Sequence, residues 1–392
     1  MLPDRRRLLE HLRQTVRRTD WTLVLAACLL MVIGIAFIWG AARKTQEGGW
    51  FPLTGLARKQ VLWGIVGLAA MVTTLIIPYR FFARFGYTLY VLALGALTYV
   101  LLFGPEINYA RRWIALGPLT VQPSEFTKVV FVIALAKYLR YKESYRHWWG
   151  LLLPFLVAGL PMLLVVPEPD LGSALVFLPT LFALLYAAGA RKKHLLLYLV
   201  VPLAVLVVVW FFLLRPLDIH LLARYQQDRL LAFLAPERYA RGPGYQLLQS
   251  LIAVGSGGLW GKGLGRGSQG QLGFLPARQT DFIFASVAEE WGFVGATVVL
   301  GLYLYLLLGG VAIARRTREP FGRLLVVGVM TLWASQALIN TGMTVRLTPI
   351  TGLPLPFVSY GGSSLVANFI ALGLLLNVGA RPEDVLSRED FQ

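Results

Sequence analysis

The sequence is poor in charged residues and nearly free of cysteine. Only 15% of its 392 residues are charged and Cys28 is the single cysteine, whereas 57% are hydrophobic. Soluble domains carry about a quarter charged residues, so a water-soluble core could not hide this much apolar surface. One cysteine excludes an internal disulfide. The scarcity of charge therefore places the chain among membrane proteins before any motif is considered.

Several motifs of soluble enzymes are also missing. The four histidines are scattered and form no cluster with metal-ligand spacing. The sequence has no Walker phosphate-binding loop and no dinucleotide fingerprint. The apolar run that begins at Trp21 is longer than a signal-peptide core and lacks a small-residue cleavage site, so we expect an uncleaved first span. No organic cofactor is indicated.

Basic residues give the chain a net charge of +17 but do not form one patch. They occur in short groups between apolar runs, as in the cytoplasmic loops of polytopic membrane proteins, so nucleic acid is not an expected partner. The groups are Arg5 to Arg7 with Arg17 and Arg18, Arg80 and Arg84, Arg140 to Arg146, Arg191 to Lys193, Arg315 to Arg323, and Arg381.

Ten apolar runs are long enough to cross a bilayer, which takes roughly 20 helical residues. They lie at about 21–42, 60–78, 82–103, 122–139, 150–167, 171–189, 194–214, 282–310, 322–344 and 363–379. We therefore predict an all-α polytopic membrane protein with both termini cytoplasmic, on the side of the basic loops. Its parts would be a basic segment 1–20, a transmembrane domain 21–380 and a tail 381–392.

Two segments outside the spans have open interpretations. Residues 5–18 place Leu9, Leu12 and Val16 on one helical face among arginines, which fits either an interfacial helix or a disordered basic tail. The extracytoplasmic loop at about 215–281 contains the Gly-rich segment 255–267 with Lys262 and Arg266. Its backbone N–H groups and two cations could wrap an anion such as phosphate, or the segment could be a flexible surface loop.

Ionisable residues at membrane depth are costly and are therefore candidates for function. Glu125 and Lys128 share a helix face, either as a structural ion pair or as a cation aimed at an anionic head group. Asp170 and Asp281 both stand at helix starts, where a carboxylate can simply cap N–H groups. Asp281 also lies where the long loop meets the membrane, so it could act as a general base.

Two further features surround these carboxylates. Glu289 and Glu290 follow Asp281 in the same span, and being adjacent they should point in different directions, so that at most one faces the other charges. Pro349, Gly352, Pro354 and Pro356 interrupt the helix before the segment 359–364, and non-helical backbone at this depth must line a cavity or water.

Five motifs, in order, resemble the SEDS family (shape, elongation, division and sporulation). They are Ala110-Arg-Arg-Trp-Ile114 with Gln122-Pro-Ser-Glu-Phe-Thr-Lys128, Pro169-Asp-Leu-Gly172, Thr280-Asp-Phe-Ile-Phe-Ala285, Glu289-Glu290, and Pro354-Leu-Pro-Phe-Val-Ser-Tyr-Gly-Gly362. The last of these resembles the elongation branch (RodA) more than the division branch (FtsW). Two positions depart from the family pattern: Gln279 stands where His is frequent, and Glu168 where Gln is frequent.

The resemblance implies a peptidoglycan glycosyltransferase of the bacterial cytoplasmic membrane. Such an enzyme polymerises lipid II on the outer face during elongation, embedded in membrane lipid. Its partners would be a class B penicillin-binding protein and other membrane proteins of the elongation complex. The family's essential aspartate falls on Asp281. Its other conserved charges fall on Arg111, Arg112, Glu125, Lys128 and Asp170.

The expected mechanism is an inverting displacement with Asp281 as base. Cations would offset the pyrophosphate charge, with support from other polar residues, and a divalent ion, Mg²⁺ or Mn²⁺, could be held by Glu125 or Asp170. The expected cations are Arg111, Arg112, Lys128, Lys262 and Arg266, and the supporting residues are Glu125, Asp170, Glu289, Glu290 and Ser359. The alternatives are a flippase for the same lipid and a non-catalytic scaffold for the crosslinking partner.

Overall fold

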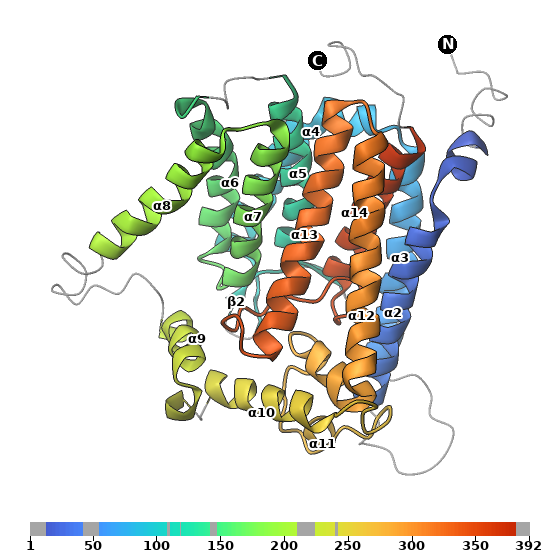
Figure 1. The fold of residues 1–392 in the computed structure, drawn as a ribbon, viewed down its shortest axis with the longest axis vertical. Helices are drawn as coiled ribbons and strands as arrows, with labels where there is room; N and C mark the ends of the chain where they lie inside the picture. Colours follow the sequence, from blue (N-terminus) through green and yellow to red (C-terminus); the bar gives the residue numbers. More distant parts are fainter. Residues whose placement is uncertain are drawn as a thin grey trace.

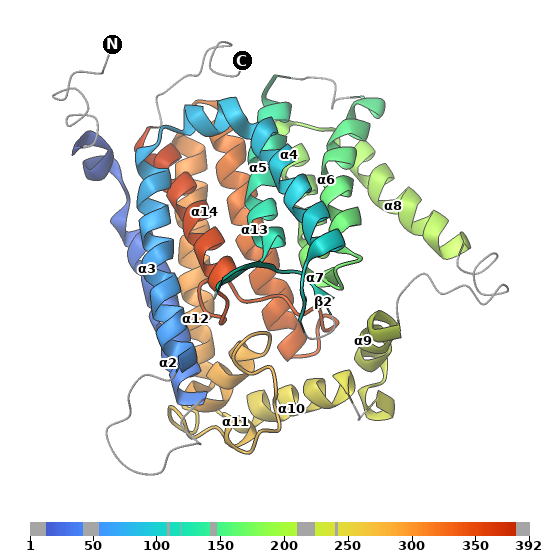
Figure 2. The same cartoon turned by 180° about the vertical axis from the view of Figure 1, so that it is seen from behind.

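The structure is a computed structural model that describes residues 13–41, 55–107, 110–117, 119–141, 147–209, 224–239 and 242–381. Long helices form a bundle, and three shorter helices lie across one of its ends (Figures 1 and 2). The start of α2 and the end of α14 lie at the opposite end of the bundle. The chain therefore enters and leaves the bundle at the same end, which agrees with the prediction that both termini lie on one side of the membrane.

Ten helices in the described part of the chain correspond to the ten apolar runs, which confirms the all-α polytopic fold. They are α2 (Trp21–Ala41), α3 (Gly55–Ile76), α4 (Tyr79–Phe103), α5 (Pro123–Tyr141), α6 (Leu152–Val165), α7 (Leu171–Ala188), α8 (Lys192–Val209), α12 (Ile283–Arg316), α13 (Pro320–Thr344) and α14 (Gly362–Ala380). Seven of them are long and apolar enough to cross a membrane by length and composition: α2, α3, α4, α7, α12, α13 and α14.

The centre of the bundle is α14, which packs against α3, α13, α5 and α12. Its side chains are buried on nearly every face, as expected of an apolar helix surrounded by others. Aromatic rings connect it to its neighbours: Phe357 meets Trp333 at 5.5 Å and Phe369 at 5.2 Å between ring centroids, both edge to face. By contrast, α3 and α4 expose large apolar side chains such as Leu62 and Val91, which suits contact with lipid.

The long loop is largely helical where the structure describes it. It contains α9 (Arg224–Leu234), a 3₁₀ turn η5 (Pro236–Tyr239), α10 (Pro243–Ser256) and the short α11 (Ser268–Gln271). At the other end of the bundle, residues 13–18 are helical and Val16 is exposed. Leu9, Leu12 and the tail beyond residue 381 lie outside the described residues.

Two small antiparallel hairpins connect α4 to α5. They are β1 (Glu106–Ile107) with β2 (Ala110–Arg111), and β3 (Ile114–Leu116) with β4 (Leu119–Val121). The turn between β3 and β4 uses Gly117 at φ +62°, a backbone conformation that favours glycine. The link between the hairpins carries Arg112 to the end of the bundle where α9 lies.

The eighth predicted span is two helical pieces joined at Gly292, whose φ of 67° and ψ of −162° are not helical. The Gly-rich segment fills the break: the N–H groups of Lys262 and Gly263 donate to the carbonyls of Glu289 and Glu290 at 3.1 and 2.8 Å. A Cβ on Gly292 would lie 2.4 Å from the backbone nitrogen of Gly261. Glycine is therefore required for this close approach.

Candidate active site

A cavity of about 390 Å³ lies where the starts of α5, α7 and α12 meet the irregular segment before α14. Four charged residues that the sequence singled out line it, together with residues of the Pro/Gly-interrupted segment, which confirms that this segment borders a cavity. The charged four are Arg112, Glu125, Asp170 and Asp281, and the segment contributes Gly352, Pro354, Tyr360 and Gly361.

Asp281 does not cap α12, because the N-cap is Phe282 and no side chain caps that end. Its backbone is instead fixed from two sides. Asn340 donates from Nδ2 to the Asp281 carbonyl at 2.8 Å, and Ser359 donates from Oγ to the Thr280 carbonyl at 2.6 Å. The carboxylate is therefore held at the cavity by a backbone that cannot easily shift.

The groups around Asp281 shift its pKa in opposite directions. Burial raises the pKa of the Asp281 carboxyl, and the charge of Asp170 raises it further. Arg229, a hydrogen bond from Thr280 and, more weakly, Arg112 lower the same pKa. A carboxylate whose pKa is moved toward neutral pH is a better general base than one with an ordinary pKa.

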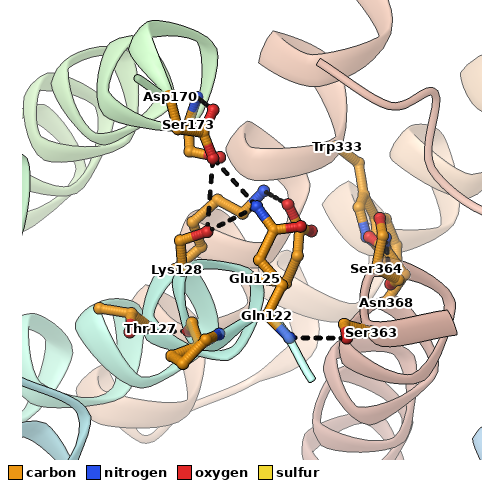
Figure 3. A network of polar contacts seen from close by, with 12 residues as sticks. Gln122, Glu125, Thr127, Lys128, Asp170, Ser173, Trp333, Ser363, Ser364 and Asn368 are labelled. Atoms are coloured by element: carbon orange, nitrogen blue, oxygen red, sulfur yellow. Dashed lines mark hydrogen bonds and ion pairs between the residues drawn. The ribbon is translucent and has the colours of Figure 1, made fainter. Parts of the chain in front are cut away.

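Asp170 has three hydrogen-bond partners as well as a place at the cavity. Its Oδ1 accepts from the Ser173 backbone N–H at 3.1 Å, so the helix cap expected from the sequence is present. Its Oδ2 accepts from Gln122 Nε2 at 3.1 Å and from Ser124 Oγ at 3.4 Å (Figure 3). Asp170 thus ties the start of α7 to the start of α5 beneath the cavity.

Glu125 and Lys128 form the ion pair that their spacing predicted, with Lys128 Nζ 2.7 Å from Glu125 Oε1 and both side chains buried (Figure 3). Glu125 borders the main cavity. Lys128 does not line it; this side chain faces a much smaller pocket that Trp333, Gln336 and Asn368 also line. The lysine therefore lies behind the glutamate as seen from the cavity.

The two adjacent arginines lie in different places. Arg112 donates from Nε to the Glu168 carbonyl at 2.6 Å and from its guanidinium to the Pro169 carbonyl. Arg111 is half exposed and lies 3.9 Å from Glu106 on the neighbouring strand. Only Arg112 of this pair lines the cavity.

Glu168 is a buried carboxyl beside this cluster. Neither of its side-chain oxygens has a hydrogen-bond partner among the residues that the structure describes. Burial raises the pKa of Glu168 to about 8; the Asp170 charge also raises it, while Arg112 lowers it. At this position the sequence departs from the family pattern, and the departure places a carboxyl where its charged form is destabilised by burial.

The Gly-rich segment does wrap an anion, but the anion belongs to the protein. Lys262 Nζ lies 2.7 Å from Glu289 Oε1, and the Gly265 N–H donates to Glu290 Oε2 at 2.7 Å. We expected the adjacent glutamates to point apart; both meet this segment because it wraps around the helix at the break. Lys262 and Arg266 do not line the cavity.

The residues present do not fit a metal ion held by the protein. The described residues contain no group of three His, Cys, Asp or Glu side chains that could bind one. Glu125 is paired with Lys128, and both Asp170 oxygens already accept hydrogen bonds. We therefore derive no step through a metal, and the divalent ion stays a prediction.

Sequence reasoning missed two residues of this site. Arg229 on α9 lines the cavity and donates to the Thr351 carbonyl at 3.2 Å. Asn340 on α13 bridges the Asp281 and Leu353 carbonyls. No local pattern marks either residue, because each acquires its role from a contact with a distant part of the chain.

Known proteins resemble this chain over nearly its whole length. The model of the FtsW/RodA/SpoVE family, described as cell cycle protein, matches residues 20–383. A probable peptidoglycan glycosyltransferase FtsW of Geobacter metallireducens is 34% identical, covering 93% of this chain and 96% of its own. The peptidoglycan glycosyltransferase RodA of Treponema pallidum is 33% identical, covering 92% and 98%.

One solved structure extends the similarity to three dimensions. It is described as the structural coordination of polymerization and crosslinking by a peptidoglycan synthase complex. It superposes with a TM-score of 0.77 at 35% identity, covering 93% of this chain and 99% of the other.

Proposed function

This chain belongs to the FtsW/RodA/SpoVE family, the SEDS family that its motifs indicated, and we propose that the cavity at Asp281 is where it joins sugars. The protein is a multi-pass membrane peptidoglycan glycosyltransferase, as its relatives are named over almost their full length. The observation that supports this site is the convergence of Asp281, Asp170, Glu125 and two arginines on one cavity. Relatives of both branches match, so the elongation role stays a prediction.

The proposed reaction is a single displacement with inversion. An acceptor sugar hydroxyl oxygen attacks the anomeric carbon of the donor, and the bond from that carbon to the lipid pyrophosphate breaks. The hydroxyl proton passes to the Asp281 carboxylate, and the electron pair leaves with the pyrophosphate. Arg112 and Arg229 are the arginines on the cavity wall in the described residues, and Arg112 would offset the charge that grows on the leaving group.

The proposed substrate is lipid II, used on the outer face of a bacterial cytoplasmic membrane. The basic loops support this orientation, because they would leave α9 to α11 and the cavity on the far side from the cytoplasm. The proposed partner is a class B penicillin-binding protein, since the similar solved structure is a complex that couples polymerization to crosslinking. Lys128, which supports Glu125, would act on substrate only through that pair.

The direct test is polymerisation of purified lipid II by the protein together with its partner. We expect long glycan from the wild type and none from Asp281→Asn. Asp228→Asn is the matched control, because Asp228 lies in the same loop but does not line the cavity. Transport of lipid II across liposomes without any polymer would contradict the proposal and favour the flippase. Polymer from Asp281→Asn at the parent rate would remove Asp281 as the base.

A further inference from the structure

The cation that acts most strongly on Asp281 comes from the long loop, and no motif indicated it. Gly352 borders both groups: from the position that a Cβ on Gly352 would occupy, Asp281 Oδ2 is 3.4 Å away and Arg229 Nη1 is 3.5 Å away. The carboxylate and the guanidinium thus border the same small space on the cavity wall. Opposite charges that border one small space stabilise each other's charged forms.

The helix that carries Arg229 is attached to the bundle by a second arginine. Arg346 donates from Nε to the Phe233 carbonyl at 3.3 Å and from Nη2 to the Leu234 carbonyl at 3.2 Å. These are the last carbonyls of α9, which have no partner within the helix. Arg229 itself donates to the Thr351 carbonyl at 3.2 Å. Both arginines therefore join α9 to the segment that follows α13.

We propose that Arg229 is a positioning residue of the transferase, whose guanidinium holds the Asp281 carboxylate in its charged, proton-accepting form. This inference rests on the proposed role of Asp281 as base. It also makes α9 a working part of the active site, because the cation reaches Asp281 only while α9 is docked. The long loop would then control the base rather than only cover the cavity.

The other groups that face Asp281 do not replace this cation. Arg112, from the link between the hairpins, lowers the pKa of Asp281 less than Arg229 does, and it donates to the Glu168 and Pro169 carbonyls. Asp170, at the start of α7, is negative and acts in the opposite direction, as burial does. Thr280 contributes a neutral hydrogen bond. Loss of Arg229 should therefore raise the pKa of Asp281.

The test is the pH dependence of kcat/KM for polymerisation, measured with fluorescent lipid II on the complex with its partner. A base must be charged to act, so kcat/KM falls as pH drops through the pKa of Asp281. Removing a nearby cation moves this limb to higher pH by about one unit or more. We expect Arg229→Gln to show this shift, with roughly tenfold lower kcat/KM below the limb and recovery at high pH.

Control variants distinguish this role from a structural one. Arg229→Lys should shift the limb less, because it keeps a positive charge, and it provides the test if Arg229→Gln does not fold. Arg238→Gln should not shift it, since Arg238 is exposed on η5 in the same loop. A loss that is equal at every pH would overturn the proposal and indicate that Arg229 only binds substrate or docks α9. Full activity of Asp281→Asn would instead refute the proposed base itself.

Discussion

Asp281 and the pair Glu289 and Glu290 lie close together in the sequence, yet their surroundings differ. The two glutamates are enclosed by the Gly-rich segment, where Glu289 accepts from Lys262, Ser268 and Gln269. Asp281 borders an open cavity and has opposing charges around it. A carboxylate whose oxygens are satisfied within the protein holds the fold together. One that faces a cavity with few partners is available for chemistry.

Substitution of Asp281 should have the largest effect on catalysis. Asp281→Asn keeps the shape of the side chain but removes the proton acceptor, so the rate should fall by about 10²- to 10⁴-fold. The melting temperature in detergent should not fall, because the side chain does not cap α12 and its burial disfavours the charged form that asparagine removes. Lipid II polymerisation and a thermal melt measure the two effects. A large loss of stability would show that Asp281 is part of the scaffold.

Substitution of Glu289 should instead lower the stability of the protein more than its activity. Glu289→Ala removes the carboxylate that pairs with the Lys262 ammonium and accepts from the Gln269 N–H, and breaking a mostly buried pair costs about 3 kcal/mol or more. We expect a clearly lower melting temperature, while the folded fraction keeps far more activity than Asp281→Asn. Glu237→Gln, at an exposed position on η5, is the control and should change neither quantity. If folded Glu289→Ala protein were as inactive as Asp281→Asn, the two regions would not be distinct.

The same comparison explains what the sequence could predict. Helices are local, so runs of apolar residues located all ten, although α3 begins five residues earlier and α12 ends six residues later than predicted. At the start of α3, Arg58 and Lys59 interrupt the apolar pattern, while their long side chains can reach the interface from within a helix. Local spacing likewise predicted the pair of Glu125 with Lys128 and the cap at Asp170.

The cation sites depended on tertiary contacts and were harder to predict. A glycine-rich segment with Lys262 and Arg266 has the composition of a phosphate cradle, and only the fold shows that Glu289 and Glu290 occupy it. Arg229 lies in a helix whose polar sequence predicts a solvent-exposed part of the loop. Its contact with Thr351 is 122 residues away in the sequence, so no spacing rule could find it.

Glu168 offers a smaller, pH-dependent effect at the edge of the cavity. Its pKa is raised from the ordinary value of 4.5 to about 8 in the folded protein, chiefly by burial. Between these two pKa values the folded state therefore binds more protons than the unfolded state. The free energy of unfolding accordingly falls as pH rises from about 4.5 through 8. In Glu168→Gln this titration is absent, so the variant should melt higher than the wild type near pH 8 and similarly near pH 4.5. Parallel melting curves across this range would contradict the assignment.

Replacing either of two glycines by alanine should have the smallest effect on stability. The two variants also give the sharpest comparison between the cavity and the rest of the loop. Gly352 and Gly273 have nearly the same φ, +75° and +74°, so alanine should cost each about 1–2 kcal/mol of backbone strain. Their neighbours differ: a Cβ on Gly273 meets nothing within 4 Å, whereas one on Gly352 would contact both Asp281 Oδ2 at 3.4 Å and Arg229 Nη1 at 3.5 Å. Both variants should therefore melt at similarly lowered temperatures. Only Gly352→Ala should also lose polymerase activity and move the acid limb of kcat/KM upward, because the methyl group would contact the Asp281 carboxylate and exclude water from it, which raises its pKa. Equal activity in the two variants would mean that the space beside Asp281 has no part in the reaction.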